Sequence, residues 1–288
     1  MWRRIGMAVL VLCGTFASFA APAPESRSAL AGAFADRPSQ RADADDVDVE
    51  LILAVDVSYS MDPDEQALQR EGYMSALTSP EFLTALKSGI HGRIALTYFE
   101  WANSNDQKIL LPWRLIDGLA SAQAVADEIA RAPYRRAYRT SISGALLFAT
   151  RLFETSGHRG IRRVIDVSGD GTNNEGPLIV PTREAVIANG ITVNGLPIML
   201  KKPQPGSIDI EDLDIYYEDC VIGGPAAFVV PIKERDKFKD AVRTKLVLEV
   251  AGRTPAEHVV PAAAAPRISC TIGERMWQQR WGNGLDMR

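Results

Sequence analysis

The chain has few of the side chains on which most hydrolytic enzymes depend. Only three histidines occur among its 288 residues, and His91, His158 and His258 each fall in a predicted loop or tail. The G-x-S-x-G turn that exposes a nucleophilic serine is absent from the sequence. A phosphatase with an aspartyl nucleophile would need a second aspartate two residues after Asp56, where this chain has Ser58. A hydrolase is therefore a secondary hypothesis, and we expect a protein without catalytic residues.

Cysteine is as scarce as histidine, and positive charge is not in excess. Lysine and arginine total 32 against 36 acidic residues, which gives a formal net charge of −4. A mildly acidic chain lacks the basic footprint of nucleic-acid binding, so we expect no nucleic-acid partner. Cys220 and Cys270 lie far from the N-terminus, and an oxidising compartment would permit them to pair. The sequence leaves open whether they form a disulfide or remain free thiols.

Long apolar runs are missing except at the N-terminus, where residues 1–20 form a short basic region followed by an apolar core. Small residues at Ser18 and Ala20 are typical of a signal peptidase site, so we expect cleavage after residue 20. The alternative is an N-terminal membrane anchor, for which the apolar run is short. We therefore predict a periplasmic or secreted protein with no stable membrane insertion after cleavage.

Three further segments follow the predicted signal peptide. Residues 21–47 are rich in Ala, Pro, Ser and Asp without periodic apolar spacing, which indicates a flexible leader. Residues 48–252 form the expected domain, and residues 253–288 form a C-terminal tail. We expect Trp277 and Trp281 of this tail to pack back on the domain rather than bind a ligand.

Strands and helices are predicted to alternate along the domain. Residues 49–55 are almost continuously apolar, the pattern of a strand buried on both faces of a parallel sheet. Residues 201–218 hold two prolines and several acids, which predicts a surface excursion. The alternation predicts an α/β fold, a doubly wound, mostly parallel sheet of about six strands with helices on both faces. The predicted strands are 49–55, 92–99, 108–113, 163–168, 191–199 and 227–230, and the predicted helices are 62–74, 80–86, 117–130, 141–154, 181–189 and 233–250.

Three oxygen-bearing side chains follow the first predicted strand at every second position, Asp56, Ser58 and Ser60 in D-V-S-Y-S. At a strand tip this spacing can turn all three toward one point. Open parallel α/β sheets place their ligand sites there, at the carboxyl ends of strands. Carboxylate and hydroxyl oxygens are hard donors that suit Mg²⁺ or Mn²⁺. The pattern predicts a divalent-cation site, and the alternative is capping of the next helix with no metal.

Two later loops add matching oxygen donors, Thr140 in R-T-S and Asp170 in V-S-G-D-G. Together with D-V-S-Y-S, they resemble the metal-ion-dependent adhesion site of the von Willebrand factor type A superfamily, whose fold is Rossmann-like. The resemblance covers residues 48–252. The strings R-R-V-I-D-V-S-G-D-G-T-N-N and G-I-T-V-N-G-L-P-I look like an exported bacterial branch of that superfamily, known as a domain of unknown function. The metal ligands implied are Asp56, Ser58, Ser60, Thr140 and Asp170.

The resemblance also implies how these residues divide the coordination. Ser58, Ser60 and Thr140 would bind the cation directly, and the two aspartates would bind directly or through water. Two carboxylates only just neutralise a divalent ion, which therefore stays electrophilic toward an outside carboxylate. We expect a cation-dependent, adhesion-type binding module whose unidentified protein partner presents an Asp or Glu. A metal-free structural or interaction subunit is the alternative.

Three more residues lie next to the implied ligands. Arg139 precedes Thr140 at a position where the superfamily commonly has glycine. Its guanidinium could compete with the cation or help to hold an acidic ligand. Asn173 and Asn174 follow Asp170; they could line the rim of the site, but we interpret them as ordinary loop residues.

Overall fold

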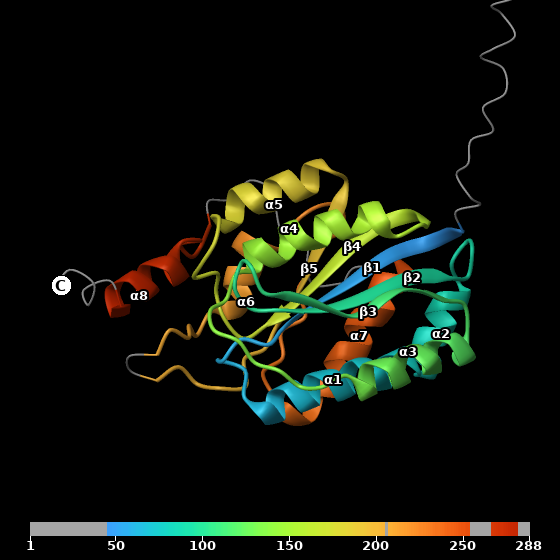
Figure 1. Ribbon diagram of the computed structural model, residues 1–288, viewed down its shortest axis with the longest axis horizontal. Helices are drawn as coiled ribbons and strands as arrows, with labels where there is room; N and C mark the ends of the chain where they lie inside the picture. Colours follow the sequence, from blue (N-terminus) through green and yellow to red (C-terminus); the bar gives the residue numbers. More distant parts are fainter. Residues whose placement is uncertain (1–44, 205–206, 254–265, 282–288) are drawn as a thin grey trace, which may run out of the picture. The chain divides into compact units, whose positions relative to one another are not determined.

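Five strands form one sheet in the order β3-β2-β1-β4-β5, with β1 at the centre (Figure 1). The computed structural model describes residues 45–204, 207–253 and 266–281. The predicted signal peptide, His258 and nearly all of the predicted leader lie outside these residues. The strands are β1 Asp46–Asp56, β2 Ile94–Trp101, β3 Gln107–Ile116, β4 Arg159–Gly169 and β5 Ile191–Pro197.

Helices cover both faces of the sheet, because the side chains of β1 alternate between two apolar cores. Leu51 and Leu53 pack with the helices on one face, and Ile52 and Ala54 pack with those on the other. The first face carries α1 Pro63–Leu77, α2 Pro80–Lys87, α3 Leu119–Arg131 and α7 Phe238–Ala251. The second carries α4 Ile142–Leu152, α5 Ile179–Ala188 and the short α6 Leu213–Tyr216.

The strand pairing determines where the candidate site lies. β1 runs parallel to both β2 and β4, β4 runs parallel to β5, and β2 and β3 form the expected antiparallel hairpin. Val55 pairs with Ser168, so the carboxyl ends of β1 and β4 reach the same edge of the sheet. The strand after β1, β2, lies next to β1 toward one edge of the sheet, whereas the strand after β4, β5, lies next to β4 toward the opposite edge. Ligand sites form at such a reversal of strand order.

A sixth strand at residues 227–230 is not formed, so this prediction is wrong. Among the described residues the segment makes only the isolated bridge Gly195–Val229 with β5, and a second bridge, Ile198–Ile232, follows just beyond both. The Val230 N–H donates to the Gly195 carbonyl and the Ile232 N–H to the Pro197 carbonyl, but Pro197 has no N–H to bond to the Val230 carbonyl, so the ladder is interrupted between them. The expected α/β architecture is confirmed with five strands in the described part of the chain.

The prediction that residues 201–218 form a surface excursion is wrong for the last third of that range. Leu213, Tyr216, Tyr217 and Cys220 are all buried, and they pack into the core on the α4 and α5 face. Their spacing of three, four and seven residues is that of one helical face, which the nearby acids obscured. The chain there forms α6 followed by a π-helical turn at Tyr217–Val221.

The ends of the predicted domain differ slightly from the structure. β1 begins at Asp46, inside the stretch predicted as leader, and α7 ends at Ala251. A further helix, α8 Ile272–Trp281, lies in the predicted tail. None of the helices in the described residues has the length and apolar character needed to span a bilayer.

Candidate metal site

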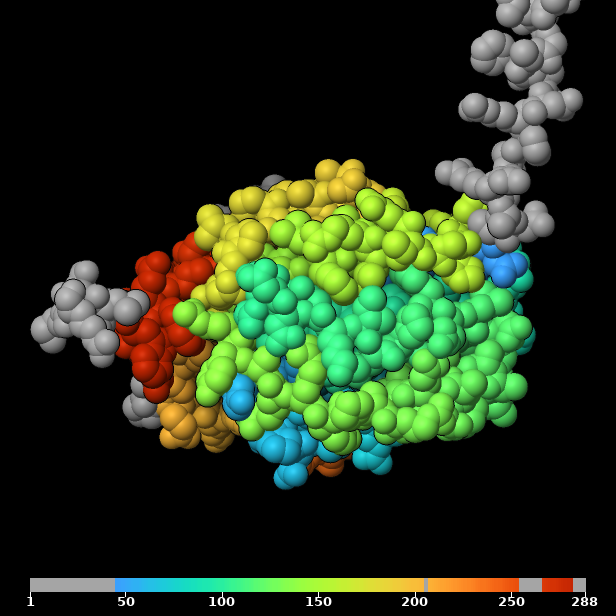
Figure 2. Space-filling model, viewed as in Figure 1, coloured from blue at the N-terminus to red at the C-terminus, as the bar shows by residue number. Residues whose placement is uncertain are grey.

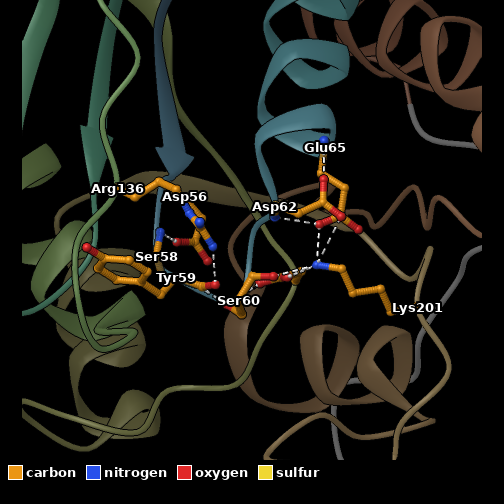
Figure 3. A network of polar contacts seen from close by, with 9 residues as sticks. Asp56, Ser58, Tyr59, Ser60, Asp62, Glu65, Arg136 and Lys201 are labelled. Atoms are coloured by element: carbon orange, nitrogen blue, oxygen red, sulfur yellow. Dashed lines mark hydrogen bonds and ion pairs between the residues drawn. The ribbon is translucent and has the colours of Figure 1, made fainter.

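The first three predicted ligands lie where β1 ends, and Asp170 joins them from the end of β4. The Ser58 and Ser60 hydroxyl oxygens are 2.7 Å apart (Figure 3). Ser60 donates to Asp170 Oδ1 at 2.6 Å. The Ser58 N–H donates to Asp56 Oδ1 at 2.7 Å, which fixes that carboxylate at the strand tip. Neighbouring oxygens around an octahedral Mg²⁺ are about 3 Å apart, since each bond is about 2.1 Å long. The spacing of these donors therefore suits one small ion.

Thr140 reaches the same edge from the loop that precedes α4. Its hydroxyl oxygen lies beside Gly171, 3.8 Å from where a Cβ of that residue would be. The Thr140 N–H donates to Asn174 Oδ1 at 3.1 Å, and the Asn174 N–H donates to the Thr140 carbonyl at 2.9 Å. These bonds use the backbone of Thr140, and its hydroxyl forms no hydrogen bond with the described residues. The structure thus brings all five predicted residues to one edge of the sheet.

The carboxylates of the candidate site are held away from water. Asp56 is fully buried, and burial together with the charge of Asp170 raises its pKa well above the usual range. Burial raises the pKa of Asp170 to about 7, against the opposing effects of the Ser60 hydrogen bond and the Lys201 charge. Two buried carboxylates close together are costly unless a cation balances them. The electrostatics of the site therefore favour a bound positive charge.

Lys201 supplies part of that positive charge, and the sequence did not predict this residue as part of the site. Its ammonium group contacts Glu65 and the Ser60 carbonyl (Figure 3). It also lies 3.6 Å from Asp170 Oδ2. Desolvation acts to lower the pKa of Lys201, but hydrogen bonding to Glu65 and the charge of Asp170 together raise it above its usual value. Lys201 also lines a pocket of about 400 Å³ next to Asp170. No local pattern marks this lysine, because it arrives from the loop after β5.

A buried carboxylate oxygen without a hydrogen-bond partner indicates whether a metal fits the site. Asp56 Oδ2 is buried and has no hydrogen-bond partner among the described residues, and the same is true of the Tyr217 hydroxyl. A buried carboxylate oxygen without a donor is unusual, and a cation would satisfy it. The described residues contain no cluster of three or more His, Cys, Asp or Glu side chains able to hold a metal. A metal here would depend on hydroxyl oxygens, as the D-x-S-x-S spacing predicts.

Comparison with known proteins identifies the family. A family model described as "Protein of unknown function (DUF1194)" matches residues 46–254, which is most of the chain. The chain belongs to the DUF1194 family. No curated protein matches this DUF1194 chain.

Solved structures similar to the DUF1194 domain share its fold at low sequence identity. Proximal thread matrix protein 1 from the mussel byssus is 15% identical over 72% of this chain and 49% of its own, with a TM-score of 0.53. A second structure of that protein, described as having a zinc-occupied MIDAS motif, is 16% identical over the same shares, with a TM-score of 0.50. The pilus adhesin SpaC from Lactobacillus rhamnosus GG is 12% identical over 71% of this chain and 30% of its own, with a TM-score of 0.51.

These similarities confirm the von Willebrand factor type A-like fold expected from the sequence. The DUF1194 chain spans about half of the mussel protein and less than a third of the adhesin. The similarity therefore concerns the fold and does not show what this chain binds. Coordination of a metal by the five predicted residues remains a prediction that the geometry accommodates.

The interpretation of Asn173 and Asn174 as ordinary loop residues is wrong. Both are buried; Asn174 holds Thr140 of the candidate site, and Asn173 holds the first turn of α4, which follows the Thr140 loop. Asn173 Oδ1 accepts from the Ser143 N–H at 3.0 Å, while Asn174 Oδ1 anchors Thr140. The two asparagines in G-T-N-N predict a polar loop, but the local pattern does not indicate that their side chains are buried.

Arg139 has a conformation that explains why glycine is common at this position. Its φ is 77°, in the left-handed region that costs an ordinary residue about 1 kcal/mol. The guanidinium lies 3.5 Å from the centroid of the Trp277 ring, so a cation–π contact offsets some of that cost. Trp277 thus packs back on the domain as expected, whereas Trp281 is 53% exposed.

Helix α8 is fastened next to the candidate site by several contacts, and Figure 2 shows it in red against the yellow and orange segments. Cys220 and Cys270 form a disulfide, which settles the alternative left open by the sequence. Asn173 Nδ2 donates to Glu274 Oε1 at 2.9 Å. A Cβ at Gly273 would lie 2.1 Å from the Asn173 carbonyl oxygen, so only glycine permits this close approach. The helix therefore supports the loop that holds Thr140.

Proposed function

We propose that this protein is a divalent-cation-dependent binding module that captures a carboxylate of a protein partner. The observation that carries the proposal is the meeting of Ser58, Ser60 and Asp170 oxygens within hydrogen-bond distance at the end of β1. The buried, unpartnered Asp56 Oδ2 and the free Thr140 hydroxyl complete a donor set of two carboxylates and three hydroxyls. Such a set suits Mg²⁺ or Mn²⁺.

The bound cation would supply an electrophile for a carboxylate oxygen from outside the chain. Ser58, Ser60 and Thr140 would face it with hydroxyls, which are weak donors and leave positive charge on the ion. Asp56 and Asp170 would hold it, directly or through water. The burial of both carboxylates strengthens this attraction, because the local dielectric is low. The exported location predicted from residues 1–20 would place the partner outside the cytoplasm.

A binding role accounts for the site better than an enzymatic one. The described residues around Asp56 provide no histidine, and the hydroxyls of Ser58 and Ser60 bond to one another and to Asp170 rather than to a general base. Nucleophilic serines require such a base within hydrogen-bond reach. A metal-free structural subunit remains the second candidate, because Lys201 already provides one positive charge at Asp170.

Calorimetry with Mn²⁺ and Mg²⁺ tests the proposal. We expect saturable heats for the protein and none for Asp56→Asn, which keeps the shape of the side chain and removes its charge. Asp127→Asn is the matched control, since Asp127 is an exposed carboxylate on α3. Equal heats for all three proteins would refute the metal site. Retained partner capture in the presence of a chelator would favour the metal-free subunit.

A further inference from the structure

Two loops that carry predicted ligands are joined into one surface beside the candidate metal site. The Ala137 N–H donates to the Val57 carbonyl at 3.1 Å, which ties residues 134–140 to residues 57–60. On this surface the rings of Tyr59 and Tyr138 stack with their centroids 4.3 Å apart. They are 46% and 70% exposed, respectively. A stacked pair of tyrosines with this exposure offers a rigid, amphipathic contact area.

Two arginines complete what we call the Tyr–Arg rim, formed by Tyr59, Arg136, Tyr138 and Arg139. Arg136 donates to the Tyr59 carbonyl at 2.6 Å, and its guanidinium lies 4.8 Å from the Tyr59 ring centroid (Figure 3). Tyr59 stands between Ser58 and Ser60, and Arg139 stands directly before Thr140. Arg136 therefore contacts a residue that adjoins two predicted metal ligands in the sequence, and Arg139 itself adjoins a third.

The charges of the rim arginines are not neutralised by the part of the chain that is described. Their neighbour Arg135 shows the contrast, because it pairs with Glu100 at 3.0 Å and with Asp106 at 2.6 Å. Arg136 and Arg139 make no ion pair with any described residue and instead contact aromatic rings. In a chain of net charge −4, two unpaired guanidinium groups at one edge produce a local positive field.

We infer that the Tyr–Arg rim binds a second acidic side chain of the partner, so that the partner is an acidic protein segment rather than one with an isolated carboxylate. This inference rests on the proposed function, in which the first carboxylate binds the metal. Guanidinium groups pair with carboxylates through two parallel hydrogen bonds, which favours acidic residues over other polar groups. Tyrosine and arginine are also the residues that dominate protein–protein binding energy.

Binding of immobilised poly-L-glutamate in the presence of Mg²⁺ tests the inference, with a glycine–serine peptide carrying a single glutamate as the comparison probe. We expect the protein to bind poly-L-glutamate more tightly than the single-glutamate peptide. Arg136→Gln should weaken poly-L-glutamate binding about fivefold to tenfold and leave the calorimetric metal affinity unchanged. Arg151→Gln is the matched control, since Arg151 is exposed at the far end of α4.

The possible outcomes separate this inference from the proposed function. If Asp56→Asn and chelator abolish binding while Arg136→Gln and Arg139→Gln together do not change it, the rim has no such role and the metal site stands. If binding survives both Asp56→Asn and chelator, the proposed function fails and this inference fails with it. Binding of an anionic polyuronate in place of poly-L-glutamate would overturn the assignment of a protein partner.

Discussion

At the scale of single residues, Lys201 and the proposed cation compete for the same carboxylate. The lysine ammonium group is 3.6 Å from Asp170 Oδ2 and also contacts Glu65, a residue of the α1 capping box. Two positive charges this close repel each other strongly at a partly buried site. Lys201 therefore stabilises the site when no metal is bound and limits how tightly a metal binds.

Replacing this lysine should strengthen metal binding. We expect Lys201→Met to raise the Mn²⁺ affinity about tenfold, because the repulsion between the ammonium group and the ion disappears. Titration calorimetry measures the change. Lys202→Met is the control, since Lys202 lies in the same loop and forms no ion pair with Asp170 among the described residues. An unchanged or lower affinity for Lys201→Met would show that Lys201 does not oppose the cation.

Gly169 leaves room for the buried carboxylate of Asp56. A Cβ at this position would lie 2.7 Å from Asp56 Oδ2 and 3.1 Å from the Tyr217 hydroxyl. Gly169→Ala should displace Asp56 and weaken Mn²⁺ binding about tenfold to a hundredfold, the range seen when the support of a metal ligand is lost. Calorimetry and circular dichroism together measure affinity and folding. Metal binding at full strength in a folded Gly169→Ala protein would contradict the placement of Asp56.

At the scale of elements, some of the fold was predictable because its signals are local. Residues 49–55 identified the central strand, and Asp62 with Pro63 identified the start of α1, where the capping box is present. The site followed from the same logic, since parallel strands bring their carboxyl ends together. Residues that act across the fold were not predictable. Lys201 and the buried amides of Asn173 and Asn174 reach the site only after the chain has folded.

The link between α8 and the core is another element that local patterns did not reveal. The disulfide between Cys220 and Cys270 anchors the segment, and Arg267 reinforces it through ion pairs with Glu218 and Asp219. The family model ends at residue 254, so α8 lies beyond the matched region. It nevertheless packs on Arg139 and Asn173, next to predicted ligands. We therefore expect α8 to stabilise the loop that carries Thr140.

Removing the disulfide should release this helix. We expect the double variant Cys220→Ser, Cys270→Ser to lose about 2–4 kcal/mol of unfolding free energy, because its unfolded chain is less constrained. Thermal unfolding measures the loss, and hydrogen exchange of residues 272–281 should become faster. Reductant should lower the stability of the parent protein and leave that of the variant unchanged. Equal stability of parent and variant without reductant would contradict a role for this link.

At the scale of the whole molecule, a buried ionic cluster joins α7 to the centre of the sheet. Lys245 lies 2.6 Å from Asp166 of β4 and also contacts Glu249, and all three side chains are almost completely buried. Two carboxylates share one ammonium group, so one negative charge is in excess. Burial and the charge of Asp166 raise the pKa of Glu249 to about 7, against the effects of Lys245 and Asn194.

This cluster should make stability depend on pH. With its pKa raised to about 7, Glu249 should keep a proton in the folded state at pH values where an unfolded glutamate, with a pKa near 4.3, has lost it. Since the folded state binds more protons between these values, the unfolding free energy should fall as pH rises through this window, by at most about 1.4 kcal/mol per pH unit. Glu249→Gln should flatten this dependence and be more stable than the parent at pH 8.

Urea unfolding between pH 4 and pH 8 measures this dependence. Glu154→Gln is the control, because Glu154 is an exposed carboxylate whose loss should leave the pH profile unchanged. A Glu249→Gln protein with the same slope as the parent would show that Glu249 is ionised throughout. The cluster would then carry its excess negative charge in the folded state.

The most direct measurement of the central claim is anomalous diffraction from crystals of the protein grown with Mn²⁺. The account predicts one ordered ion at the carboxyl ends of β1 and β4, with the hydroxyl oxygens of Ser58, Ser60 and Thr140 about 2.1–2.2 Å away. Asp56 and Asp170 should face the ion directly or through water. An anomalous peak elsewhere, or none at this edge of the sheet, would contradict the account.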